Sequence, residues 1–318
     1  MSDAYIGIDL GTTALKAVAV QADGSVIAAV NKDLELRIDT GGRREQSPQR
    51  VVAALSDALS ELKATVGPAV WSNVRGLGLA AQGGSAIICD RTTGDPLTAM
   101  YLWNDARHTN DVAAVYEMMP PSYWLAFARR QACGAGLGRL RYLIRENAQL
   151  IHPDNIYAGA GEFLFFQLTG VWRQDAGNAL QIGCYNASER AIDDAPLRLV
   201  GATGSFVAPL RVGHPSAALS AAAAERYGLT PGLPVVGPYM DHEAGYLSVA
   251  TAINGPRAPL QCSLGTAWVG NLVMPDGVDW TSPLQLAIPS PVNDGILVVQ
   301  PLLTGNVTWD WALSQFVS

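Results

Sequence analysis

Charge of either sign is scarce in this sequence, since only 15% of its 318 residues are charged. Twenty-one Lys and Arg against 28 Asp and Glu leave a net charge of −7, so no cationic excess is available to hold a polyphosphate backbone. No stretch approaches the roughly 20 apolar residues that cross a bilayer, and the N-terminus has no basic and apolar signal pattern. These absences predict a cytoplasmic protein without a nucleic-acid or membrane partner.

Cysteine is equally sparse. Cys89, Cys133, Cys184 and Cys262 lie far apart and form no C-x-x-C pair, which excludes a zinc knuckle and a dithiol redox motif. The pattern favours free thiols in a reducing compartment. Apolar residues make up 49% of the chain, enough for one large core or two moderate ones.

Turn residues divide the chain into alternating strand and helix patterns. An N-terminal meander of three strands is followed by a helix that begins after Ser47, has Pro48 in its first position and ends at Gly67. The remaining patterns predict strands at 74–80, 86–90 and 233–237 and helices at 137–145, 162–168 and 217–227. Interleaved strands and helices predict an α/β fold.

An internal echo suggests duplication. Residues 8–14 and 262–268 share a Leu-Gly-Thr core, and each enters a β-rich stretch. Residues 258–274 again predict strand, tight turn and strand, with a later strand at 296–299. A duplicated domain whose second copy begins near residue 246 explains both observations.

The turn at Gly11, Thr12 and Thr13 is a candidate phosphate site. Consecutive backbone N–H groups and two hydroxyls there suit a phosphate oxygen, and Asp9 can hold hydrated Mg²⁺ beside it. The alternative for a single such turn is an ordinary hairpin with a capping Asp. A second turn at Gly265-Thr266 favours the phosphate interpretation, because two facing turns can clamp one nucleotide.

Six ordered motifs carry a family resemblance over essentially the whole chain: Asp9–Thr13 with Lys16, Gly78–Gln82, Leu102–Arg107, Leu168–Gly170, Gly232–Val236 leading to Asp241, and Ser263–Thr266. In order and spacing they resemble the FGGY family of carbohydrate kinases. The resemblance implies the actin-like ATPase fold with two ribonuclease-H-like domains. The first would cover residues 1–245, and residues 246–318 would be a truncated second copy.

The resemblance also implies an activity: transfer of the γ-phosphoryl of Mg-ATP to a hydroxyl of a ketose or polyol, with ATP and Mg²⁺ as cofactors. Asp241 would be the general base. Asp9, Gly11, Thr12, Thr13, Gly265 and Thr266 would hold the phosphates, with Asp9 also on the metal. The sugar pocket would be lined by Gln82, Gly83, Trp103, Asn104, Asp105 and His242. Homodimerisation is left open.

Several of these residues have structural alternatives. Trp103 can be a core aromatic instead of a stacking surface for a sugar. Asn104 and Asp105 can cap the helix expected from Ala106, and Asp241 can cap a helix over 244–252. The last role is compatible with catalysis, because the positive end of a helix favours an ionised carboxylate.

Two departures from the family pattern matter. Gly83-Gly84 follow Gln82 where glycerol kinases carry Arg-Glu and xylulokinases Met-His, so we expect a wider pocket for a polyol or a larger ketose. The chain stops at Ser318, inside an expected helix, so we also expect weak ATP turnover by these residues alone. The alternative function is a non-catalytic sugar-binding or regulatory protein derived from such a kinase.

Overall fold

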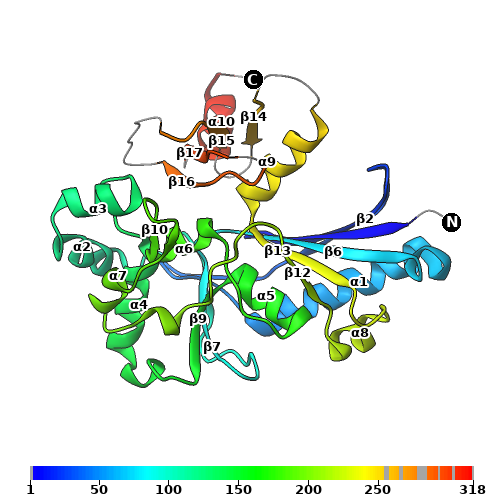
Figure 1. Ribbon diagram of the computed structural model, residues 1–318, viewed down its shortest axis with the longest axis horizontal. Helices are drawn as coiled ribbons and strands as arrows, with labels where there is room; N and C mark the ends of the chain where they lie inside the picture. Colours follow the sequence, from blue (N-terminus) through cyan, green and yellow to red (C-terminus); the bar gives the residue numbers. More distant parts are fainter. Residues whose placement is uncertain are drawn as a thin grey trace.

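The computed structural model describes residues 3–253, 258–264, 268–277, 285–292, 294–302 and 305–316. In the described part of the chain, three larger sheets, a two-stranded hairpin and their helices build the molecule (Figure 1). The largest sheet has the strand order β12-β13-β6-β1-β2-β3. Its strands are β1 Ala4–Leu10, β2 Ala14–Gln21, β3 Val26–Asp33, β6 Val74–Ala81, β12 Ser216–Ala218 and β13 Pro234–Met240. The predicted N-terminal meander is confirmed.

Alternation of side chains places one face of the largest sheet in the core. In β1, Ile6, Ile8 and Leu10 are buried while their neighbours are more exposed, as expected for a strand with period two. The helices that pack with this core are α1 Pro48–Trp71, α5 Ala160–Thr169 and α8 Ala221–Tyr227. β1, β6 and β13 run parallel, so their carboxyl ends meet at one edge.

Helix α1 begins as the sequence predicts but continues past its predicted end. The Ser47 side chain caps it by accepting a hydrogen bond from the Arg50 amide. Gly67 adopts φ 78° and ψ 165°, which kinks the helix, and the helix resumes at Pro68. The second part is held because the Trp71 indole is buried and donates to the Gly228 carbonyl at 2.8 Å.

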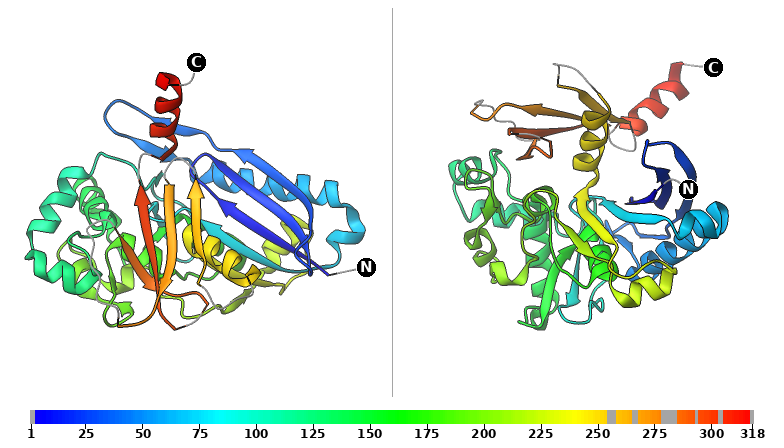
Figure 2. Two further views of the ribbon diagram at one scale, coloured as in Figure 1. Left: turned by 90° about the horizontal axis from the view of Figure 1, so that it is seen from above. Right: turned by 45° about the vertical axis from the view of Figure 1, so that its right-hand side comes forward.

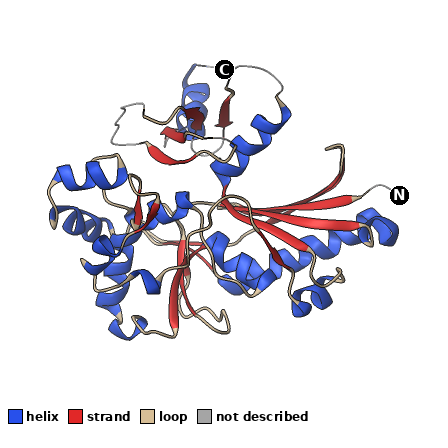
Figure 3. Cartoon of the chain, in the orientation of Figure 1, coloured by secondary structure: helices blue, strands red, loops and turns tan. Residues whose placement is uncertain are grey.

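A second sheet has the order β4-β5-β8-β7-β9. Its strands are β4 Leu36–Ile38, β5 Arg44–Gln46, β7 Ala86–Asp90, β8 Met100–Tyr101 and β9 Asn155–Gly159. Beside it lie α2 Thr109–Glu117, α3 Pro121–Ala128, α4 Ala135–Glu146, α6 Ala176–Ile182, α7 Asp194–Arg198 and the small hairpin β10 Tyr185–Asn186 and β11 Ala191–Ile192 (Figure 3). Two 3₁₀ turns complete this region, at Ala148–Leu150 and Gly204–Phe206.

The helix predicted over 217–227 was wrong in its first third. Residues 216–218 form β12, which pairs with β13, and Ser220 then caps α8 by accepting from the Ala223 amide. Alanine fits both elements, so only pairing with β13 decides between them.

A smaller sheet lies beyond α9, Asp241–Ala252, which rises from the end of β13 (Figures 1 and 2). Its order is β14-β15-β17-β16, formed by β14 Leu260–Leu264, β15 Trp268–Met274, β16 Leu286–Pro289 and β17 Ile296–Leu302, and α10 Gly305–Phe316 follows. The antiparallel run β14-β15-β17 repeats β1-β2-β3, which confirms the two predicted strands of the echo, while the predicted turn between them lies outside the described residues. Within the described residues, no helix has the length and apolar character needed to span a bilayer.

Candidate functional site

The candidate site lies where three parallel strands end together. Leu10 of β1 pairs with Ala81 of β6, which in turn pairs with Met240 of β13. The residues next to these positions are Asp9, Gln82 and Asp241, taken from segments far apart in the sequence. The carboxyl edge of parallel strands is the usual place for a ligand in an α/β sheet.

Asp9 and Asp241 approach each other across this edge. Burial raises the pKa of the Asp9 carboxyl, Lys16 opposes that effect, and the charge of Asp241 adds to it. Lys16 Nζ lies 3.8 Å from Asp9 Oδ2; the Lys16 side chain is exposed, whereas the Asp9 side chain is partly buried, with 41% of it exposed. The two carboxylates therefore form an anionic pair that is accessible to solvent and only partly neutralised.

Asp241 stands at the start of helix α9, three residues earlier than the sequence predicts. Met240 takes the N-cap position, so Asp241 is the first helical residue, and its Oδ1 accepts from the His242 amide at 2.9 Å. The helix dipole favours a negative charge there. His242 Nε2 lies 3.8 Å from Asp241 Oδ1, so the predicted base and the predicted sugar ligand are neighbours.

The Thr12 hydroxyl connects the candidate phosphate turn to the predicted sugar pocket. It donates to Gln82 Oε1 at 3.0 Å and accepts from Trp103 Nε1 at 3.2 Å. Gln46 Nε2 donates to the Thr12 carbonyl at 2.6 Å, and Gln46 Oε1 accepts from Gln82 Nε2 at 3.1 Å. Three long-range partners thus fix the turn before any ligand binds.

Gln46 was missed by the sequence analysis. It lies at the end of β5, is 1% exposed and shares no motif with Thr12 or Gln82. A lone glutamine beside Ser47 gives no local signal, because its contacts depend on how the first two sheets meet.

We expect Thr12→Val to weaken both the turn and sugar binding. Valine keeps the shape but leaves Gln82 Oε1 and Trp103 Nε1 without their shared partner, which costs about 1–3 kcal/mol of unfolding free energy. Urea unfolding measures this loss. Thr12→Ser keeps the hydroxyl and should restore most of it, so equal losses in the two variants would contradict the role of the network.

Gly83 does not widen the pocket, and this corrects the expectation from the sequence. A Cβ at Gly83 would lie 2.8 Å from Met240 Cγ and Sδ, so the space beside the glycine is already filled. Met240 is 2% exposed and also contacts Gly177. The glycine therefore allows close packing of Met240, which places Asp241 directly after a buried anchor.

The neighbouring Gly84 peptide is held from both sides. Its N–H donates to Asn178 Oδ1 at 3.3 Å, and its carbonyl accepts from Arg139 Nη1 at 2.6 Å. Arg139 is fully buried in α4 and also donates to the Leu102 carbonyl, one residue before Trp103. The sequence analysis missed Arg139, which links the two loops that carry the predicted sugar ligands.

Asp105 is buried in an ionic cluster and does not cap a helix. Helix α2 begins at Thr109, and His108 takes its N-cap position. The Asp105 carboxylate accepts from the Arg44 amide at 2.8 Å and from Arg107 Nη2 at 2.7 Å, while Arg107 also reaches Glu45 Oε1 at 2.6 Å. The adjacent Asn104 differs, because its Oδ1 is buried without a hydrogen-bond partner within the described residues.

A second set of carboxyl groups is buried behind Asp241. Burial, followed by the charge of Asp175, raises the pKa of Glu162, and burial also raises the pKa of Asp175. Burial also raises the pKa of Glu243, in the first turn of α9. Arg211 Nη2 partly offsets this rise by donating hydrogen bonds of 2.8 and 2.9 Å to the Glu243 carboxylate. Each of these acids therefore ionises less readily in the folded chain than in water.

We expect stability to fall as pH rises because of Glu162. Its folded pKa exceeds the unfolded value of about 4.3, so its stabilising contribution is complete below that pH and is lost as pH rises through the folded pKa. Glu162→Gln should flatten the fall, since a neutral amide carries no ionisation cost. Urea unfolding from pH 5 to 9, with Glu117→Gln at an exposed position as the control, measures the difference; parallel wild-type and Glu162→Gln curves would refute it.

The second predicted phosphate turn, Gly265-Thr266, lies outside the described residues. Its flanking strands β14 and β15 are described and pair in antiparallel register, Leu264 opposite Trp268. Among the residues that the structure covers, no group of three or more His, Cys, Asp and Glu side chains could hold a metal ion. Asp9 does meet the lower requirement of Mg²⁺, which binds through one or two carboxylates plus phosphate oxygens and water.

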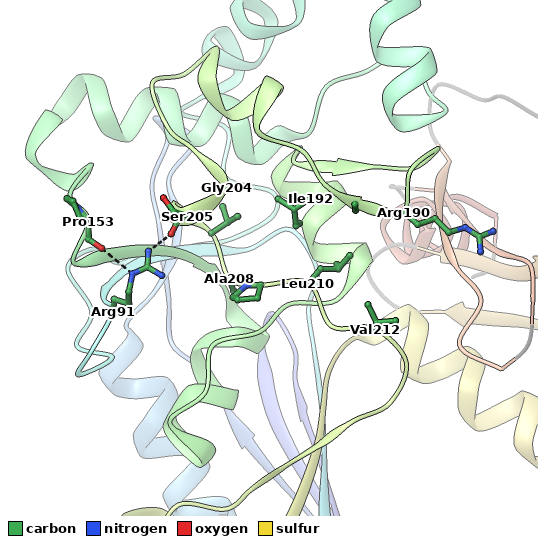
Figure 4. Close-up of a pocket in the computed structure, with 12 residues that line it drawn as sticks. Arg91, Pro153, Arg190, Ile192, Gly204, Ser205, Ala208, Leu210 and Val212 are labelled. Atoms are coloured by element: carbon green, nitrogen blue, oxygen red, sulfur yellow. Dashed lines mark hydrogen bonds between the residues drawn. The ribbon is translucent and has the colours of Figure 1, made fainter.

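Two cavities lie elsewhere in the described part of the chain. The larger, about 740 Å³, is open and mostly apolar, and its Arg91 is already bonded to backbone carbonyls, including that of Ser205 (Figure 4). The smaller, about 210 Å³, lies beside Glu243 and Arg211 and reaches Pro291 near β16. Neither is lined by a predicted site residue.

A family profile and individual sugar kinases both match the sequence of this chain. The sequence profile of the FGGY family of carbohydrate kinases, N-terminal domain, matches residues 4–248. A xylulose kinase of Bacillus subtilis is 23% identical over 265 residues, covering 83% of this chain and 52% of its own length. A xylulose kinase of Staphylococcus epidermidis is 33% identical over 207 residues, and the match covers 58% of this chain and 40% of that kinase. The chain thus spans about half the length of the curated relatives it matches.

Solved structures confirm the fold. The xylulose kinase of Rhodospirillum rubrum superposes with a TM-score of 0.85 at 21% identity, and the Plasmodium falciparum glycerol kinase with ADP gives 0.85 at 15%. The matches cover 98% and 99% of this chain and 64% of each of those chains. The predicted α/β, actin-like architecture is confirmed, while the division at residue 245 stays a prediction.

Proposed function

This chain belongs to the FGGY family of carbohydrate kinases, and we propose that it serves ATP-dependent phosphoryl transfer to a hydroxyl of a ketose or polyol. The observation that carries the proposal is the meeting of Asp9, Gln82 and Asp241 at the ends of three parallel strands. Phosphoryl transfer demands mainly positioning, charge neutralisation and a proton acceptor. The site offers a turn that carries two threonines beside two solvent-accessible carboxylates.

In this proposal Asp241 is the general base. It would accept the proton of the attacking hydroxyl while that oxygen bonds to the γ-phosphorus and the bond to the bridging oxygen of ADP breaks. Support comes from its position in the first turn of α9, at the end of β13, and from its solvent-accessible side chain.

Asp9 would hold Mg²⁺. The pKa of its carboxyl is raised by burial and by the charge of Asp241, so a cation between nucleotide phosphates and this edge would relieve an anionic pair. The metal supplies charge neutralisation on the phosphates. On motif alone, Thr12 and Thr13 would contribute N–H groups, Thr13 its hydroxyl, and Gly265 with Thr266 a second turn. The Gly11 N–H already donates to the Ala14 carbonyl at 2.9 Å, so Gly11 would serve by letting the backbone approach the phosphates closely.

The sugar would lie against Trp103, with Asn104, the Gly83 backbone and His242 as polar partners. Asn104 Oδ1 is a buried acceptor without a partner, which supports a ligand contact. Gln82 and Asp105 are nearly buried and bonded within the protein, so we assign them positioning roles through Thr12 and Arg107.

A coupled assay of ADP release tests the function. Glycerol, erythritol, D-xylulose, D-ribulose and a heptulose would each be added to Mg-ATP, and calorimetry would measure sugar binding separately. ADP release that depends on one of these compounds supports a kinase. Sugar binding without release would indicate the non-catalytic alternative, and ATP hydrolysis indifferent to every sugar would point to another ATPase of this fold.

A further inference from the structure

One wall of the predicted sugar pocket has no side chains of its own. Gly83 and Gly84 follow Gln82 directly after β6, and Gly84 has φ +76°, which side-chain-bearing residues rarely adopt. Polar side chains for a ligand on this wall must therefore come from a neighbouring element, beyond what the glycine backbone itself offers.

That neighbour is helix α6, and the side chain is Gln181. A Cβ at Gly84 would lie 3.3 Å from Gln181 Cδ, 3.5 Å from Gln181 Nε2 and 3.4 Å from Trp103 Cβ. A Cβ at Gly83 would lie 3.9 Å from Gln181 Nε2. The carboxamide of Gln181 thus lies across both glycines and next to the base of the Trp103 side chain.

The amide of Gln181 is unused. It forms no hydrogen bond to any residue that the structure describes, although the side chain is half-buried, and its atoms are not sealed from solvent. A half-buried amide in a polar pocket without protein partners is an open donor and acceptor pair.

Helix α6 holds this amide in a fixed place. The Asp175 side chain caps the helix by accepting from the Asn178 amide at 2.8 Å, and Asn178 bonds the Gly84 N–H. On its other side the backbone of α6 packs against Gly134 and Gly136, where a Cβ would lie within 2.7 and 2.6 Å of it. A rigid helix fixed to the glycine loop is a precise support for a binding group.

We propose that Gln181 is a substrate-binding residue whose carboxamide hydrogen-bonds hydroxyl groups of the polyol or ketose and so determines which sugar is accepted. This inference rests on the proposed function. An amide suits the task, because a sugar hydroxyl both donates and accepts and because no charge is buried in the complex. Because Gly83 and Gly84 have no side chains, nothing from this loop stands between the Gln181 carboxamide and a ligand in the pocket.

Gln181→Leu provides the test, since leucine approximates the shape and removes both polar atoms. Calorimetry would measure the dissociation constant of the best-binding sugar from the panel above for the wild type, this variant and Gln149→Leu, a control at an exposed position. We expect about tenfold weaker binding by Gln181→Leu, corresponding to one good hydrogen bond, and no change in the control. Gln181→Glu, which keeps an acceptor, should lie between.

Deoxy analogues of the same sugar identify the hydroxyl. Removing the hydroxyl that Gln181 binds should weaken binding to the wild type about tenfold but leave binding to Gln181→Leu almost unchanged, which is the non-additivity of a direct contact. Equal affinities of wild type and Gln181→Leu for the sugar, or additive losses for every analogue, would overturn the inference alone. A wild type that binds none of the sugars would overturn both this inference and the proposed function.

Discussion

Replacing Asp241 by asparagine is expected to lower the rate of sugar-dependent ADP release by about 10²–10⁴-fold, the usual contribution of a positioned general base. Asparagine matches aspartate in size and keeps a carbonyl oxygen for the His242 amide, so helix α9 should still begin at this residue. What is lost is the ability to accept a proton from the attacking hydroxyl.

The matched measurement is sugar affinity by calorimetry, which should change little because the proton leaves only during the reaction. Asp23→Asn serves as the control, since Asp23 lies in the turn after β2, at the end of that strand away from the candidate site, and within the described residues its side chain bonds Ser25. A rate for Asp241→Asn within threefold of the wild type would remove Asp241 from the role of base, whatever happens to binding.

The largest stability effect is expected from Arg107→Met. Arg107 is the cation between Glu45 and Asp105, and the three side chains are 14%, 6% and 0% exposed. Methionine fills part of the volume but leaves two buried carboxylates without their shared partner. Removing one partner of a buried ion pair costs about 3–5 kcal/mol of unfolding free energy. Urea unfolding at pH 7 with sugar absent measures the loss directly.

Arg141→Met is the control for this prediction. Asp111 is also buried, but it bonds both Arg141 at 2.7 Å and Arg145 at 2.9 Å, and these arginines are exposed to solvent. Deleting one leaves the other in place, so we expect a loss below about 1 kcal/mol. Similar losses in the two variants would show that the Arg107 cluster contributes no more than a surface pair.

The same cluster sets a pH dependence. Burial opposes ionisation of Asp105, but contacts with His108, Arg107 and the Arg44 amide outweigh it and hold the pKa of Asp105 well below its usual range. The stability that this group contributes is present above the unfolded pKa of about 3.9 and is lost as pH falls toward the folded value. In Arg107→Met that acid-dependent loss should be smaller.

Short-range patterns made much of the fold predictable. The meander at the N-terminus, the cap at Ser47 and the repeated pair of strands β14 and β15 depend on alternation and on turn residues within a few positions. The predicted end of α1 was wrong. A glycine such as Gly67 usually ends a helix, but here the burial of Trp71 keeps the chain helical beyond the kink. Motif order alone identified the family.

The contacts of the site residues were less predictable than the fold. The sequence by itself determined which types of side chain lie at the ends of β1, β6, β8 and β13, and therefore that carboxylates, amides and an indole could meet. Only the tertiary structure decided that Thr12 bonds Gln82 and Trp103, that Asp105 is sealed against Arg107, and that Met240 fills the space beside Gly83. Apart from Asp105 and Arg107, which lie two positions apart, these contacts join residues tens to more than a hundred positions apart. They therefore depend on sheet register and on packing between sheets, which no local pattern encodes.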